Sequence, residues 1–287
     1  MFKTKLLLSI FLFHTLLLTH LYATKTKEEI VWFQHQRPPW MINEGEYKNQ
    51  GYGDKIRQIF EKELSQYNHQ TIAITPTRFY KEVKKYNNLC YGPVIKLKTI
   101  KGLFYWSKPL YIMPTQRIIV LEETFKKLGS PKELSMKQLL ANKSYTFGNI
   151  ADIKHYPFDL KTYRKQKNVV TLRNSGATNS LIAMLQKKRI DWMYDFPLFI
   201  SWHNKSSKQK KFYNYRTIKV KEAKNATKII AFMSCIKNEF GKQTIEQINQ
   251  SLTQKTILDI RTLVRSWQLD EINTNEFNKL NKKLFGF

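Results

Sequence analysis

The sequence predicts an α/β protein of two lobes, each a mainly parallel sheet flanked by helices, with a two-strand hinge between them. Two observations predict this class. From residue 29 to residue 95 the chain alternates short apolar runs, typical of strands, with stretches whose apolar residues recur at helical spacing. The alternation starts again near Tyr111 and is followed by a long helical tail. This order fits a chain that crosses between two lobes twice.

The first α/β unit contains three expected strands, at residues 29–34, 71–75 and 89–95. After the first strand, Gly51-Tyr52-Gly53-Asp54 precedes apolar residues spaced on one helix face, and Asp54 can cap this helix. A second helix is expected from Pro76 to Tyr86. Because the order is β-α-β-α-β, it favours parallel strands with covering helices.

The second unit repeats this pattern, with strands expected at 116–121, 144–150 and 190–194 and a helix at 179–188. Ser130-Pro131-Lys132-Glu133 is typical of a capped helical turn. After a polar loop near 203–211, strands are expected at 215–220 and 228–235, followed by helices. With crossings near 110–116 and 214–224, we expect a first lobe of residues 24–112 and 222–287 and a second lobe of residues 113–221.

The first 23 residues have the order of parts of a secretory signal peptide. Lys3 and Lys5 precede an apolar run from Leu6 to Leu18, and Ala23 offers a small residue at the cleavage edge. Polar residues shorten this run below the roughly 20 residues that a spanning helix requires. An uncleaved membrane anchor is the alternative. We expect residues 1–23 to be removed and the mature chain to be exported.

The composition of the 287-residue chain is strongly basic, with a formal net charge of +27, and 42% of its residues are hydrophobic. The hydrophobic share is enough to bury a real core. The charge suggests an anionic ligand or surface, but the basic residues are spread along the whole chain and are dense only at 205–211. A general enrichment in lysine explains this spread, and an exported protein has little access to nucleic acid. We expect no nucleic acid partner.

The two cysteines, Cys90 and Cys235, lie in a chain bound for an oxidising compartment. An even number of cysteines there favours a disulfide, and both fall at ends of expected strands of the same lobe. Two buried free thiols are the alternative. Neither cysteine has a ligand partner at short spacing, so we expect no metal site.

Catalytic motifs are missing from the sequence. It contains no G-x-S-x-G elbow, no H-E-x-x-H and no phosphate-binding G-x-x-x-x-G-K. The histidines after residue 23 are isolated in sequence. The absence of these motifs therefore favours a binding protein without a cofactor over an enzyme.

Several segments together resemble one known family. Arg37–Ile42 (R-P-P-W-M-I), Gly51–Asp54 and Trp106–Tyr111 (W-S-K-P-L-Y), followed by Leu185–Asp191 and Ala231-Phe232, are similar in order and spacing to bacterial extracellular solute-binding proteins of family 3. The resemblance extends over residues 29–270. It is closest to a branch with one cysteine near the third strand and another before the C-terminal helices.

The resemblance implies a type II periplasmic-binding-protein fold and a periplasmic protein that captures a small polar molecule in a cleft between the lobes. Its partners would be that solute and an inner-membrane transporter or receptor, and the protein would be a monomer. Two other readings stay open. One is an orphan signalling or binding module for an anionic ligand or surface, and the other is a periplasmic enzyme on the same scaffold.

The resemblance also implies a set of ligand-binding residues in both lobes. In the first lobe they are Pro39, Trp40, Arg78, Tyr91, Gly92, Lys101, Trp106 and Ser107, and in the second lobe Gly148, Asn149, Ser175, Tyr194 and Asp195. Plain structural roles are the alternative for several of these, with the tryptophans as core aromatics, Arg78 as a surface charge and Gly148 as a turn.

The sequence departs from the family at the position that usually grips a ligand carboxylate. Amino-acid-binding members have an arginine six residues before the aromatic that Trp106 matches, and here that position is Ile100, beside Lys101. Isoleucine cannot pair with a carboxylate, whereas arginine binds one with two hydrogen bonds. An ordinary α-amino acid is therefore not the expected ligand, although Asp195 could contact an amine. We expect a polar ligand with an apolar or cyclic part.

The signal peptide leads to a direct test. Sequencing the N-terminus of secreted or periplasmic material should give Thr24 as the first residue. Recovery of intact Met1 in the membrane fraction would show instead that the segment is an anchor.

Overall fold

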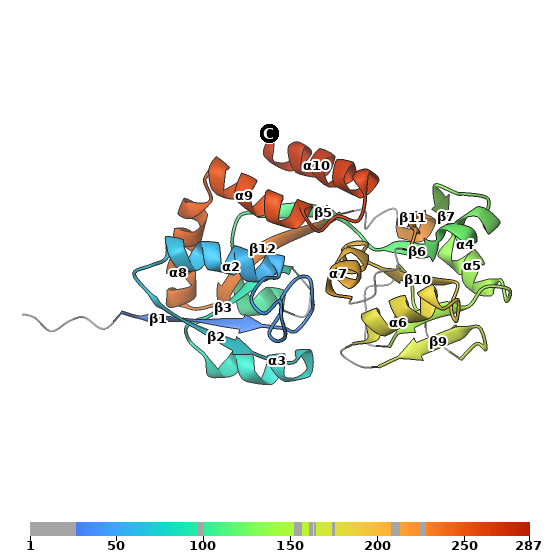
Figure 1. Cartoon of the computed structure of the whole chain (residues 1–287). Coiled ribbons are helices and arrows are strands. Elements are labelled where there is room, and N and C mark those ends of the chain that lie inside the picture. The colour runs from blue at the N-terminus through green and yellow to red at the C-terminus, as the bar shows by residue number, and fades with distance from the viewer. Residues whose placement is uncertain are drawn as a thin grey trace, which may run out of the picture.

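The computed structural model describes residues 27–96, 100–151, 157–160, 163, 165–173, 176–207, 213–223 and 228–287. The predicted signal peptide lies outside the described residues. Two six-stranded sheets, each flanked by helices, form two lobes side by side (Figure 1). In the described part of the chain, no helix is both long and apolar enough to cross a membrane.

The first sheet has the order β2-β1-β3-β12-β4, with β5 also paired to β12. Its parallel part consists of β1 (Glu29–Gln34), β2 (Asn68–Ala73) and β3 (Leu89–Ile95), joined through α2 (Tyr52–Glu63), α3 (Pro76–Glu82) and a 3₁₀ turn, η1 (Val83–Lys85). This is the predicted β-α-β-α-β unit. The antiparallel part consists of β4 (Phe104–Trp106), which follows η2 (Lys101–Leu103), then β5 (Tyr111–Pro114) and β12 (Lys228–Ile236).

The second sheet is also mixed, with the order β7-β11-β6-β10-β8-β9. Its strands are β6 (Arg117–Leu121), β7 (Glu133–Leu134), β8 (Phe147–Ile150), β9 (Val169–Leu172), β10 (Trp192–Asp195) and β11 (Tyr215–Val220), the last followed by η3 (Lys221–Ala223). The helices of this part are α4 (Glu122–Lys127), α5 (Met136–Ala141), α6 (Ala177–Gln186) and α7 (Leu198–Ser206).

The predicted helical turn at Ser130–Glu133 is wrong. Ser130 has a left-handed backbone with φ of 52°, and Glu133 lies in β7. The helix begins later because Ser135 caps it: the Ser135 hydroxyl accepts from the Gln138 amide at 3.2 Å. The Glu222 carboxylate accepts from the Met136 amide at 3.0 Å and fixes the same helix start.

The C-terminal tail forms three helices, α8 (Glu239–Ser251), α9 (Gln254–Arg265) and α10 (Glu271–Phe285). Each begins with a side chain that satisfies free backbone amides. Asn238, Thr253 and Asp270 accept hydrogen bonds from residues three positions further on, at 2.8, 3.2 and 2.8 Å. The tail packs on the first lobe.

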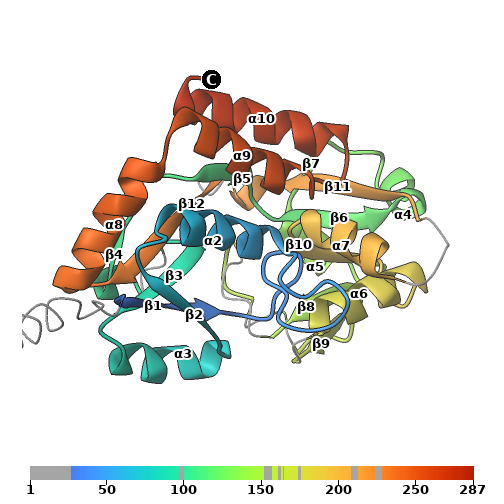
Figure 2. The same ribbon diagram turned by 60° about the vertical axis from the view of Figure 1, so that its left-hand side comes forward.

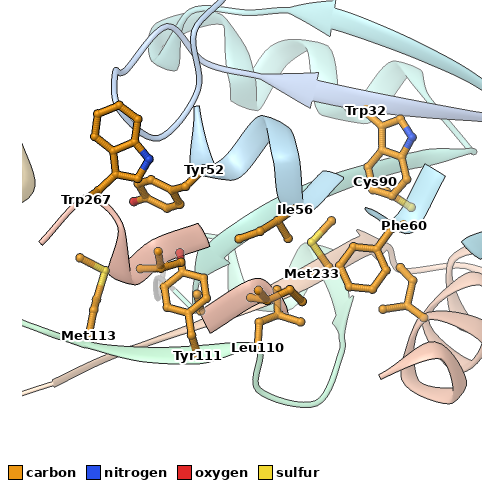
Figure 3. Close-up of a cluster of buried hydrophobic side chains, with 14 of the residues drawn as sticks. Trp32, Tyr52, Ile56, Phe60, Cys90, Leu110, Tyr111, Met113, Met233 and Trp267 are labelled. Carbon is orange, nitrogen blue, oxygen red and sulfur yellow. The ribbon is translucent and has the colours of Figure 1, made fainter. Parts of the chain in front are cut away.

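The main core of the first lobe lies between α2 and the sheet. Ile56 and Phe60 of α2 are fully buried and point toward Met233 of β12 (Figure 3). The core continues under the C-terminal helices through Ile245, Ile260 and Phe277. Burying this apolar face holds the helical tail against the first lobe.

The chain passes between the sheets at two places. β5 ends at Pro114 in the first sheet and β6 begins at Arg117 in the second, so only Thr115 and Gln116 lie between them. The return runs from β11, which ends at Val220, to β12, which starts at Lys228. Helix α7 lies between the lobes (Figure 1) and places Leu198, Phe199 and Trp202 in the core cluster of the first lobe.

Helix α10 lies over β5, next to the passage between the sheets (Figure 2). The buried Asn281 amide accepts from the Ile112 backbone N–H at 3.0 Å and donates to the Ile112 carbonyl at 2.6 Å. One to two turns earlier on the same helix, Glu276 pairs with Arg117 at the start of β6 and lies 3.7 Å from the Lys219 ammonium of β11. The helix therefore contacts strands of both sheets.

The predicted disulfide between Cys90 and Cys235 is confirmed. The two residues lie directly opposite each other on the antiparallel strands β3 and β12, with their Cα atoms 4.0 Å apart. Because their sequence separation is 145 residues, the bond closes a loop that includes the whole second lobe.

Replacing both cysteines by alanine should lower the free energy of unfolding by up to about 5 kcal/mol, since the unfolded chain regains the entropy of the open loop. Guanidinium unfolding of the variant and of the oxidised and reduced protein measures this loss. Equal unfolding midpoints for the oxidised and reduced protein would contradict it.

Candidate ligand-binding site

An aromatic wall forms at the carboxyl end of β1, where its parallel pairing with β3 ends at Tyr91. Parallel strands commonly present ligand-binding residues at this end. The Tyr91 ring centroid lies 5.3 Å from that of His35, 6.1 Å from that of Trp40 and 5.0 Å from that of Phe79. Tyr91 is buried and Trp40 is half-buried. Two predicted site residues, Trp40 and Tyr91, are therefore neighbours.

The segment that carries Trp40 is held by the glycines of the G-Y-G-D motif. The Gly53 amide donates to the Trp40 carbonyl at 2.7 Å. A Cβ atom on Gly53 would lie 2.5 Å from the Trp40 ring, and one on Gly51 would lie 2.4 Å from the Trp40 carbonyl oxygen. Only glycine allows this close approach, so the two sequence motifs form one structural unit.

Asp54 fastens the same segment to the first strand. Its buried carboxylate accepts from the Ile42 amide at 2.9 Å, from the Gly51 amide at 3.0 Å and from the Gln34 side-chain amide. Burial raises the pKa of Asp54 to about 6, and the two backbone donors oppose this rise. Gly51 is the N-cap of α2 and Asp54 is its third residue. Asp54 therefore caps the helix as predicted, by accepting a hydrogen bond from the backbone amide of the N-cap residue Gly51.

His35 lies inside the aromatic wall. Its Nδ1 is 2.7 Å from the Ile74 carbonyl oxygen, which can only accept, so Nδ1 carries the proton. Burial is the main cause that lowers the pKa of His35. The neutral ring keeps Nε2 as an acceptor.

On the second lobe, Asp195 ends β10 and is fully buried. Its Oδ1 accepts from the Phe196 amide at 2.9 Å and its Oδ2 from the Thr178 hydroxyl at 3.2 Å. Burial raises the pKa of Asp195, and the positive charge of Arg37 on the other lobe is the strongest opposing influence. Tyr194 points to the opposite face of the sheet, into the core of the second lobe.

Arg37 connects the two halves of the site, and the sequence analysis did not assign it a ligand-binding role. It lies three residues after the end of β1, and its guanidinium carbon is 5.2 Å from the ring centroid of Phe199 in α7. Its charge also lowers the pKa of the buried Tyr91 phenol, against the larger effect of burial. The sequence offered two signals for this contact. One is a cation between the end of a strand and the P-P-W turn, and the other is Phe199, four residues after Asp195.

The predicted residues near β4 form a separate group. The Trp106 ring packs against Phe232 at 6.2 Å, and its Nε1 donates to the Lys101 carbonyl at 3.2 Å. The ammonium of Lys96 lies 4.0 Å from the Phe232 ring centroid. Buried Ser107 accepts from the Met233 amide at 3.0 Å and so joins the chain to β12. Trp106 and Trp40 both pack on the apolar cluster that contains Ile100.

The remaining predicted ligand-binding residues contact other protein groups or solvent. The Arg78 side chain is 72% exposed and 3.7 Å from the Glu82 carboxylate. Gly92 lies against β12, where a Cβ would be 2.9 Å from the Phe232 carbonyl oxygen. Buried Asn149 donates to the Thr171 hydroxyl at 3.1 Å, and Pro39 is buried after a cis peptide bond. Ser175 lies outside the described residues. The ligand roles of all these residues stay predictions.

No group of three or more histidine, cysteine or acidic side chains among the described residues could hold a metal ion. The chemistry of the site is instead that of aromatic faces, one carboxylate and one guanidinium. Such groups orient a small polar molecule by contact area and charge.

Neither a family model nor a curated protein matches the sequence. Solved structures do match. The probable amino-acid ABC transporter extracellular-binding protein from Bacillus subtilis is 17% identical with a TM-score of 0.59, over 85% of this chain and 99% of that one. A putative L-cystine ABC transporter from Listeria monocytogenes is 14% identical with a TM-score of 0.57, over 85% of this chain and 97% of that one.

A third match is the periplasmic domain of BvgS from B. pertussis, 10% identical with a TM-score of 0.55, over 90% of this chain and 46% of that one. At these identities the likeness establishes the fold. The chain has the two-lobed fold of periplasmic solute-binding proteins, and the predicted fold class is confirmed.

Gly148 allows a test of its role. A Cβ on Gly148 would lie 2.4 Å from Ile190 Cδ1 and 2.9 Å from Leu181 Cδ2, so overpacking between β8 and α6 should cost about 1–3 kcal/mol in Gly148→Ala. Chemical unfolding measures this. Gly102→Ala, where the added Cβ meets nothing within 4 Å, is the control. Unchanged stability in Gly148→Ala would contradict the packing role.

Proposed function

We propose that this protein is an exported solute-binding protein that captures a small polar molecule between its lobes in the periplasm. The observation that carries the proposal is that Arg37, in the same turn as Trp40 of the aromatic wall, packs on Phe199 of α7, the helix that follows Asp195. A ligand that contacts both sides stabilises the arrangement in which the lobes are close. We propose that it acts as a monomer and without catalysis.

The passage between the sheets supports a hinge. Because only Thr115 and Gln116 separate β5 from β6, rotation of the second lobe is confined to a few backbone torsions and to the returning segment after Val220. The closed form would then present surfaces of both lobes to a membrane partner. In this scheme the partner is an inner-membrane transporter, as the names of two structural neighbours suggest.

A sensory role is the second candidate. The likeness to the BvgS periplasmic domain, of which the match covers 46%, favours it. Crosslinking the ligand-bound protein in its native membrane preparation separates the two candidates, since the transport proposal requires capture of a permease rather than a signalling receptor.

Binding of an anionic polymer by the basic surface is a different outcome of the same experiments. Affinity for such a polymer falls steeply with salt because binding releases counterions. Affinity for a solute held between the lobes changes much less over the same salt range.

Asp195→Asn should weaken binding of any captured solute by roughly tenfold or more, because a hydrogen bond to a charged group contributes about 1.5–3 kcal/mol. A thermal-shift screen of a metabolite library identifies the solute, since a ligand that binds the native state raises its melting temperature. Calorimetry then gives the affinities.

Asp259→Asn is the control, since the Asp259 carboxylate lies in α9, is 52% exposed and pairs with Lys255. Its affinity should equal that of the unaltered protein. Unchanged affinity in folded Asp195→Asn would show that the second-lobe site is assigned wrongly.

A further inference from the structure

Helix α7 follows a strand of the second sheet but contributes to the cores of both lobes. Its Ile200 is fully buried in the apolar cluster of the second lobe, which also contains Ile182 of α6. Leu198, Phe199 and Trp202 of the same helix are buried in the core cluster of the first lobe. The helix lies between the lobes (Figure 1). The two lobes are therefore joined through one shared helix.

Trp202 packs against aromatic side chains of the first lobe. Its ring centroid lies 5.4 Å from that of Tyr47, in the segment between β1 and α2, and 6.0 Å from that of Trp267, directly after α9. The Lys205 ammonium of α7 lies 4.7 Å from the Trp267 centroid and 5.7 Å from the Tyr47 centroid. A cation over two rings adds an electrostatic attraction to the apolar contact. These four residues, Tyr47, Trp202, Lys205 and Trp267, form a latch between the lobes.

The C-terminal tail adds a second connection beside the latch. Leu269, two residues after Trp267, packs on the apolar cluster of the second lobe. Glu276 of α10 pairs with Arg117 at the start of β6. The tail thus contacts the second lobe with both an apolar and a charged side chain, although its helices pack on the first lobe.

Opening the lobes at α7 would expose Leu198, Phe199 and Trp202 to water together. Burial of such side chains is favourable, and soluble proteins rarely leave a large contiguous apolar patch exposed. Opening would also separate the Lys205 ammonium from the two rings of the first lobe. These contacts are made by the chain itself, so they favour the joined arrangement before any ligand is present.

We propose that the latch holds the two lobes together in the absence of a ligand, so that the closed arrangement is the resting state of the protein. This inference rests on the proposed function only in taking the lobes to move relative to each other. A solute then adds its contacts to lobes that already lie close, instead of drawing them together from an open state. Exchange of solute requires transient release of Trp202 from the first lobe.

The test is a distance measurement on the ligand-free protein. Spin labels at Lys84→Cys in the first lobe and Lys187→Cys in the second, both exposed positions, report the distance between the lobes by double electron–electron resonance. Unfolding in guanidinium and refolding, with the Cys90–Cys235 bond kept oxidised, first removes any solute carried from the cell. The stripped protein should give one main population, at the distance between these positions in the structure.

Tyr47→Ala, Lys205→Met and Trp202→Ala each remove part of the latch. Each should add a second population at a longer distance, and Trp202→Ala should add the most because it also empties a place in the first-lobe core. Tyr47 is half-buried and Lys205 is exposed, so these two variants should keep the fold, which circular dichroism checks.

Two matched variants remove similar contacts within one lobe. Tyr80→Ala alters an exposed tyrosine that packs on Phe79 of the same helix, with ring centroids 5.5 Å apart. Lys137→Met removes an ammonium that lies 5.3 Å from the Phe158 centroid in the second lobe. Both should give the distance distribution of the unaltered protein.

Two results would overturn the inference. One is a stripped, unaltered protein whose main population lies at a longer distance than the structure has. The other is an unchanged distribution in all folded latch variants. Because these measurements need no ligand, their outcome is separate from that of the solute screen. An open protein that binds a solute keeps the proposed function without the latch, and a closed protein that binds no solute keeps the latch without the proposed function.

Discussion

The antiparallel pairing of β12 with β3 is the contact on which the two-lobed arrangement depends. β12 also pairs with β4 and β5, so one strand orders the first sheet from its centre to its edge. It brings α8, α9 and α10 back to the first lobe after the chain has built the second. The Cys90–Cys235 bond fixes the register of this pairing covalently. The same contact explains why residue 92 is a glycine, because the β12 backbone at Phe232 leaves no room for a side chain there.

The site is built on this frame by a second set of constraints. Asp54 and the two glycines hold the segment that carries Trp40 closely against the start of α2. The opposite side is equally fixed, because Asp195 ends a buried strand and Phe199 lies in the helix that follows it. Pre-positioned groups lose less entropy on binding, which favours selective recognition. In the proposed site the lobes contribute different charges, so neither lobe alone would offer the complete set of contacts.

Most of the fold could be predicted from local pattern. The strands at 29–34, 89–95 and 215–220 match because each is a short run of strand-forming residues with turn-forming residues nearby. The helical turn predicted at Ser130 was wrong, because Ser-Pro often begins a helix. Here Ser130 has a left-handed backbone and ends the α4 segment, and Ser135 provides the cap of the next helix. Of the site, Trp40, Tyr91 and Asp195 carried recognisable signals. Arg37 carried only the signal of a cation beside the P-P-W turn, because its contact with Phe199 of α7 exists only in the folded chain.

The amide of Asn281 has a consequence for how the first sheet ends. An edge strand offers unpaired N–H and C=O groups that can recruit a strand from another molecule. β5 is hydrogen-bonded to β12, and at Ile112 a single side chain supplies both an acceptor and a donor to the backbone, as an additional strand would. Because Asn281 is a fully buried residue of α10, which lies over β5, the position is closed to other chains. The helix at the C-terminus thus protects the sheet against edge-to-edge association.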